Sequence, residues 1–180
     1  SLHFKQLFDS IKFFEFNNLH HEHISYGTLN DSDGNPFKTR DGGTKPLSEL
    51  FEETYEYIKN INSALEDSTI KQLANSVLTF SDLITNRKTD YKFDLEKFTN
   101  VNGKTGIYVQ YAQVRAKKLQ QSVSQQKIEI ESLVLSDVDK QLLSQLFMFG
   151  YFLEQSSLLN EPHHLANYLY DISNSFNQFY

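Results

Sequence analysis

Residues 102–119 read Asn-Gly-Lys-Thr-Gly-Ile-Tyr-Val-Gln-Tyr-Ala-Gln-Val-Arg-Ala-Lys-Lys-Leu. Two glycines and a threonine stand at its start, a composition that is typical of a turn leading into a helix. One face of that helix carries residues at helical spacing, namely Tyr108, Tyr111, Ala112, Arg115 and Leu119. The pattern therefore predicts an amphipathic helix whose inward face includes an arginine and two phenols.

The arginine within this stripe has two interpretations. A half-buried guanidinium needs an acceptor, and tyrosines on an inward face usually have a hydrogen-bond partner too. Arg115 therefore either belongs to a core helix, paired with Asp171 or another carboxylate on the last helix, or helps to present aromatic rings and cations to RNA. Lys117 and Lys118 stand on the other edge, where we expect them to be exposed. The residues alone leave both interpretations open.

Composition limits the class of protein. The chain has 180 residues, of which 39% are hydrophobic and 22% charged, as in a folded globular domain. The net charge of −6 excludes a general affinity for nucleic acid, so RNA binding would need a local basic surface. Without cysteine the chain has neither disulfides nor thiolate zinc sites. Apolar runs are too short to span a membrane, and we expect no signal peptide, no membrane partner and a cytoplasmic location.

The rest of the chain is mainly helical in pattern. Helical spacing predicts helices at 2–14, from 45 onward, at 66–84, at 136–153 and from 162 onward. Alternation at 23–29 predicts one short strand. The fold class is therefore mainly α, a bundle of antiparallel helices after a small β-containing head. We expect one core made of Ile107, Tyr108, Tyr111, Leu142, Leu146, Leu165, Leu169 and Phe176.

Two helix starts carry specific signals. Ser136 stands three residues before Asp139, which is the spacing of a capping box. Pro162 precedes an apolar periodicity, and proline is favoured at the start of a helix. For the helix at 66–84 we expect Asp67 or Ser68 as the N-cap.

Residues 37–45 form a second region of interest. A short strand, two glycines and the cations Lys38, Arg40 and Lys45 could make a loop that meets phosphate. On spacing alone, a solvated surface hairpin is the favoured alternative. The Walker A spacing is absent from the sequence.

A metal site is not expected. His20, His21 and His23 lie close together, but only Glu22 is a further ligand at a suitable spacing.

Taken together, six segments resemble bacterial-type arginyl-tRNA synthetases, which are class I enzymes. Residues 34–44 resemble a degenerate KMSKS loop, and 108–115 resemble the family's Tyr-x-Gln-Tyr-Ala-x-x-Arg signature. The remaining likeness lies in residues 2–8, 22–27, 86–94 and 162–171. Two departures stand out: Thr39 replaces the second lysine of the loop motif, and Lys38 falls where serine is common.

The resemblance implies a fold and a function. Residues 1–62 would be the tail of a Rossmann-type catalytic domain, and 63–180 a helical anticodon-binding domain truncated at its C-terminus. The whole enzyme would activate arginine with ATP and Mg²⁺ and transfer it to tRNA(Arg). Lys38 and Arg40 would be catalytic. The ATP side would comprise His3, His23, Gly27, Phe37, Lys38, Thr39 and Arg40. The tRNA side would comprise Tyr108, Gln110, Tyr111, Arg115, Lys117, Lys118, Asn177 and Tyr180.

The resemblance also implies what this chain lacks. It has no H-x-G-H motif, so we expect a fragment that is inactive alone, holds no tightly bound cofactor and is a monomer. The alternative is a helical protein-interaction domain that derives from a synthetase but has no catalytic role.

Overall fold

A computed structural model describes residues 2–15, 20–30, 34, 46–123 and 134–180. The elements in these parts are α1 (Leu2–Phe13), β1 (Leu29–Asn30), α2 (Leu47–Ile61), α3 (Asp67–Leu83), β2 (Tyr91–Lys92), α4 (Leu95–Thr99), α5 (Gly106–Ser122), α6 (Asp137–Phe147), α7 (Phe149–Leu158) and α8 (His163–Phe179). The predicted mainly α class is confirmed. No helix in the described ranges is both long and apolar enough to cross a membrane.

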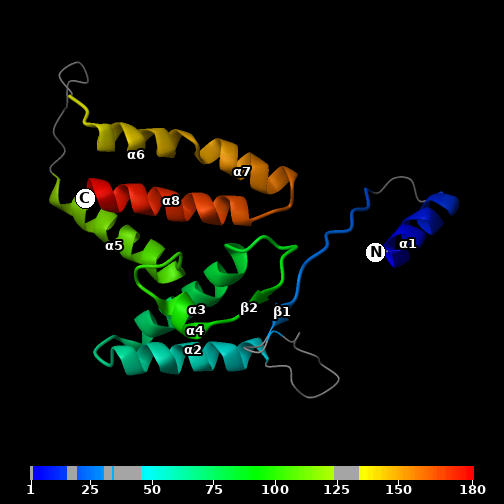
Figure 1. Cartoon of the computed structure of the whole chain (residues 1–180), viewed down its shortest axis with the longest axis horizontal. Helices are drawn as coiled ribbons and strands as arrows, with labels where there is room; N and C mark the ends of the chain where they lie inside the picture. The colour runs from blue at the N-terminus through cyan, green and yellow to red at the C-terminus, as the bar shows by residue number, and fades with distance from the viewer. Residues whose placement is uncertain (1, 16–19, 31–33, 35–45, 124–133) are drawn as a thin grey trace.

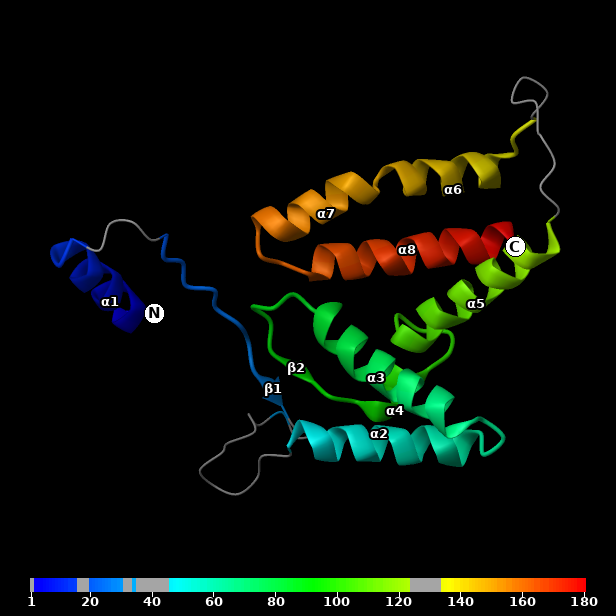
Figure 2. The ribbon, with the colours of Figure 1, turned by 180° about the vertical axis from the view of Figure 1, so that it is seen from behind.

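The helices pack in a continuous succession. α2 packs on α3, α3 on α5, α5 on α8, and α8 along both α6 and α7 (Figure 1). α8 therefore lies between the central helix α5 and the pair α6 and α7. At the other end of the molecule, α1 stands apart from these helices (Figure 2). It contacts the segment before β1, where the ring of Phe4 stacks on His23 with centroids 4.0 Å apart.

Capping chemistry explains where three helices begin. The Thr105 hydroxyl accepts a hydrogen bond from the Tyr108 amide at 3.2 Å, which fixes the start of α5. The predicted capping box of α6 is confirmed between Ser136 and Asp139. α8 begins immediately after Pro162, as predicted. For α3 the N-cap prediction is wrong: Glu66 occupies this position without a side-chain bond.

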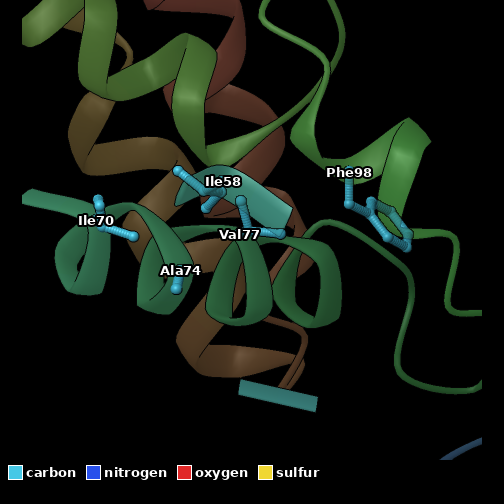
Figure 3. Close-up of a cluster of buried hydrophobic side chains, with 5 residues drawn as sticks. All are labelled: Ile58, Ile70, Ala74, Val77 and Phe98. Carbon is cyan, nitrogen blue, oxygen red and sulfur yellow. The ribbon is translucent and has the colours of Figure 1, made fainter. Parts of the chain in front are cut away.

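The principal core lies between α2, α3 and α4. Its cluster of buried side chains, shown in Figure 3, comprises Ile58, Ile70, Ala74, Val77 and Phe98. Ile70, Ala74 and Val77 lie on one face of α3, because residues three and four positions apart point the same way from a helix. Burial of such apolar surface is the main stabilising contribution to a fold of this size.

The prediction of a single core made of Ile107, Tyr108, Tyr111, Leu142, Leu146, Leu165, Leu169 and Phe176 is wrong. None of these side chains is among the buried hydrophobic residues, although Ile107 packs against the principal core. Leu146, Leu169 and Tyr111 are exposed, with 52%, 42% and 50% of their surfaces accessible. Leu146 lies on α6 and Leu169 on α8; α8 packs against α5 as well as against α6 and α7, and Leu169 still remains exposed. Helical spacing identifies an apolar face, but it does not say whether another element covers that face.

Two predicted elements differ in length. The single helix expected at 136–153 is divided at Met148, whose amide bonds back to Gln145 O at 3.1 Å in a tighter, 3₁₀-like turn. The strand expected at 23–29 is limited to Leu29–Asn30, which pair in parallel with Tyr91–Lys92. Because β2 offers only these two residues, the rest of the predicted strand has no ladder to join.

Candidate nucleic-acid interface

Arg115 is the centre of the candidate interface between α5 and α8. Its guanidinium donates to Asn177 Oδ1 at 3.1 Å and to the Tyr111 hydroxyl at 2.7 Å. The same group lies over the rings of Tyr111 and Tyr180, at 4.2 and 5.0 Å from their centroids. We name these four residues, Tyr111, Arg115, Asn177 and Tyr180, the α5–α8 cluster.

The expected carboxylate partner of Arg115 is wrong. Asp171 is exposed and lies more than a helical turn before Asn177, so the register of α8 places an amide opposite the guanidinium instead. An amide accepts a hydrogen bond without neutralising the charge. Among the described residues Arg115 therefore has no carboxylate partner, and its cation could meet an anionic ligand.

The two rings of the cluster are accessible. Tyr111 is 50% exposed and Tyr180 is 55% exposed. An aromatic ring with an accessible face can stack a base, and an arginine beside it can meet a phosphate or a base edge. Lys117 and Lys118 are exposed on the same helix, as predicted.

Tyr108 and Gln110 have different surroundings. The Tyr108 hydroxyl bonds to Asn174 Oδ1 at 3.1 Å, and its ring lies 5.3 Å from that of Tyr170. Tyr108 thus joins α5 to α8 from within. Gln110 points to α3, where its amide donates to Gln72 O at 3.5 Å. The structure therefore separates both residues from the α5–α8 cluster.

The sequence interpretation named Asn177 but missed the rest of a polar stripe on α8. Asn167, Tyr170, Asn174 and Asn177 recur at helical spacing, and each faces a residue of the α5 region. Lys104 donates to Asn167 Oδ1 at 3.2 Å and lies 5.0 Å from the centre of the Tyr170 ring. The signal was present as this repeat of amides on the last helix.

The residues proposed for the ATP side are described only in part. His3 is exposed on α1, and its ring and that of His23 both contact Phe4. Gly27 runs against Thr89, with its amide bonded to Arg87 O at 2.5 Å. Phe37, Lys38, Thr39 and Arg40 lie outside the described residues.

One further cluster has ligand-like chemistry. Among the described residues, Glu161, His163 and His164 have potential metal ligand atoms within 4.8 Å of one another. Lys88 lies 2.9 Å from Glu161 and lowers the pKa of that carboxyl, while burial lowers the pKa of His163. The carboxylate already has a cationic partner, which disfavours a metal ion there. That the chain binds no metal stays a prediction.

Two families of known proteins resemble different parts of this chain. Residues 1–95 match the family model described as "tRNA synthetases class I (R), catalytic domain", and residues 109–180 match that of the "DALR anticodon binding domain". The chain belongs to the class I tRNA synthetase (R) family. The α5–α8 cluster falls within the anticodon-binding match, and Lys38 and Arg40 fall within the catalytic-domain match.

Individual relatives point to the same family. The chain is 38% identical over 191 residues to arginine–tRNA ligase of Francisella tularensis subsp. novicida (strain U112), and 33% identical over 192 residues to that of Stutzerimonas stutzeri (strain A1501). Each comparison covers 100% of this chain and 33% of the relative, so the chain spans about a third of these relatives.

Solved structures share the fold. Thermus thermophilus arginyl-tRNA synthetase superimposes with a TM-score of 0.75 at 24% identity, over 88% of this chain and 27% of that one. The enzyme from Plasmodium falciparum gives 0.68 at 24% identity, over 99% of this chain and 32% of that one.

Proposed function

We propose that the chain is part of an arginine–tRNA ligase, the parent ligase, which activates arginine with ATP and transfers it from arginyl-adenylate to tRNA(Arg). Residues 1–62 would belong to its catalytic domain, and residues 63–180 would bind the anticodon stem-loop. The order of the two family matches on one chain is the observation that carries this proposal.

The proposed tRNA contacts follow from the chemistry of the α5–α8 cluster. A loop base splayed from the anticodon would stack on Tyr111 or Tyr180, a contact that contributes about 1–3 kcal/mol per base. Asn177 could read a base edge, and the cation of Arg115 would attract the backbone. Lys117 and Lys118 would add phosphate contacts, which appear mainly as salt dependence of binding.

The proposed ATP contacts rest on the resemblance of residues 34–44. Lys38 and Arg40 would offset the charge that develops on the phosphates during adenylation. Thr39 stands where the family has a lysine, so Arg40 or Lys45 would supply the second cation. Mg²⁺ would accompany the triphosphate, because this hard cation prefers oxygen ligands such as those of the phosphates. Phe37, His3, His23 and Gly27 would line the same side.

The alternative, a helical interaction domain without catalysis, has no observation in its favour. One experiment distinguishes the ligase from the non-catalytic domain. It measures arginine-dependent ATP–pyrophosphate exchange and tRNA(Arg) charging, both for the parent ligase and for this chain alone. We expect activity from the parent and none from the chain. A parent without arginine-dependent exchange would contradict the proposed function. We also propose that the parent ligase is a cytoplasmic monomer. Size-exclusion chromatography with light scattering would measure its mass in solution and so test the monomeric state.

A further inference from the structure

Arg87 joins three segments that are distant in the sequence. It lies in the connector between α3 and β2, and its Nε donates to Asn160 O at 2.7 Å. One terminal nitrogen donates to Leu159 O at 3.4 Å, and the other donates to Ser25 O. A single guanidinium thus bridges the turn between α7 and α8 and the segment before β1, which lies beside β2 in Figure 2.

Bonds on both sides reinforce this junction. Asn160 Nδ2 donates to Glu22 Oε2 at 3.2 Å, linking the α7–α8 turn directly to the N-terminal segment. The Thr28 amide donates to Asp90 Oδ1 at 2.7 Å, and hydrogen bonds from Thr28 lower the pKa of the Asp90 carboxyl.

The backbones approach closely at the same place. A Cβ on Gly27 would lie 2.6 Å from the carbonyl carbon and oxygen of Thr89, so only glycine fits there. The backbone of segment 22–30 is therefore in close contact with the connector at Gly27.

The Arg87 junction lies where α8 begins and close before β1 along the chain. α8 begins directly after the α7–α8 turn and ends at the α5–α8 cluster, so one rigid helix connects the proposed tRNA contacts with the Arg87 contacts. On the other side, the chain runs from β1 into the residues that include Lys38 and Arg40. Arg87 thus joins the turn that precedes α8 to the segment that leads along the chain toward these residues.

We propose that Arg87 is a positioning residue for arginine activation: it fixes segment 22–30 against the α7–α8 turn through backbone carbonyls. This inference rests on the proposed function. A guanidinium suits the task because its planar fork presents several donors at once, whereas the ammonium of lysine is a single point of charge. Lysine at position 87 could therefore restore only part of the junction.

The junction itself can be tested without any activity. In hydrogen exchange on this chain, we expect Arg87→Ala to speed exchange at the Gly27 and Tyr91 amides at least tenfold, and Arg87→Lys to have a smaller effect. Lys88→Ala is the matched control, because it removes a neighbouring cation whose ion-pair partner, Glu161, lies in the α7–α8 turn and not in segment 22–30. It should change these rates less than twofold. Unchanged exchange in Arg87→Ala would overturn the proposal.

The functional consequence is tested in the parent ligase. We expect Arg87→Ala to lower kcat for pyrophosphate exchange at least tenfold per folded molecule, with near-UV circular dichroism measuring the folded fraction. The Kd for tRNA(Arg) should stay within twofold, Arg87→Lys should be intermediate, and Lys88→Ala should match the wild type. A kcat within twofold of wild type in Arg87→Ala would overturn the proposal. If the wild-type parent shows no exchange, the proposed function fails, and hydrogen exchange still decides whether Arg87 fixes the segment.

Discussion

Replacing Gly106 by alanine should destabilise the protein, contrary to the usual effect of this change in a helix. Gly106 is the first residue of α5 and is buried against α3. A Cβ added there would overlap Ser76 O, and would lie 2.5 Å from Ser76 Oγ and 2.7 Å from the Ser76 carbonyl carbon. Two of these three atoms belong to the backbone of α3, which cannot rotate away as a side chain can.

The magnitude follows from two opposing contributions. Alanine is favoured over glycine within a helix by about 1 kcal/mol. Overpacking a tight contact costs about 1–3 kcal/mol, because the two helices must move apart. The steric cost of Gly106→Ala should lie in the upper part of this range, about 2–3 kcal/mol, because two of the three nearest atoms belong to the backbone of α3. We expect a net loss of about 1–2 kcal/mol, which lowers Tm by about 2–8 °C in a chain of this length.

Gly150→Ala is the matched control. Gly150 lies in α7, and a Cβ there would meet no atom within 4 Å. The same chemical change should therefore raise stability by about 0.5–1 kcal/mol. Thermal and urea unfolding, followed by circular dichroism at 222 nm, would measure the stability of both variants. Equal or greater stability of Gly106→Ala would refute the claimed close packing of α5 on α3.

Three further changes test other contacts. Arg115→Ala should cost about 1–3 kcal/mol in unfolding free energy, because it removes two hydrogen bonds and two ring contacts; an unchanged melting temperature would contradict this. Lys117→Ala should reduce the salt slope of tRNA binding by the parent ligase by about one unit without lowering Tm, and Lys118→Ala should do the same; an unchanged slope in both variants would exclude this edge from the interface. Hydrogen bonds from Ser136 lower the pKa of Asp139 in the folded state, so its contribution to stability is present above the unfolded value of about 4 and is lost as pH falls through the folded pKa. Asp139→Asn should therefore lower Tm at pH 6 more than at pH 3, and melts showing an equal difference at both pH values would contradict this.

Local signals predicted much of the fold. Capping at Ser136 and proline at 162 place two helix starts, because these signals depend only on neighbouring residues. The exposure of Leu146 and Leu169 could not be predicted in this way. It depends on which elements cover α6 and α8, and helical periodicity contains no information on that point.

The candidate site was predictable as a face but not as a set of contacts. Tyr111 and Arg115 follow from the spacing of the central helix. Their contacts with Asn177 and Tyr180 depend on the register of α8 against α5, which a single sequence does not reveal. The role of Arg87 was hidden for a different reason. Its partners are backbone carbonyls, which every residue possesses, so they leave no pattern in the sequence.

The most direct test of anticodon recognition is the affinity of the parent ligase for tRNA(Arg) with an intact and with a substituted anticodon, at one salt concentration. We predict a Kd at least about fivefold higher for the substituted tRNA, since a lost base-edge contact costs about 1–3 kcal/mol. Asn177→Ala should bring the two Kd values closer together, whereas Tyr111→Ala and Tyr180→Ala should raise both, because stacking does not depend on which base is present. Equal affinity of the wild-type ligase for both tRNAs, or a difference that survives Asn177→Ala, would contradict recognition by the α5–α8 cluster.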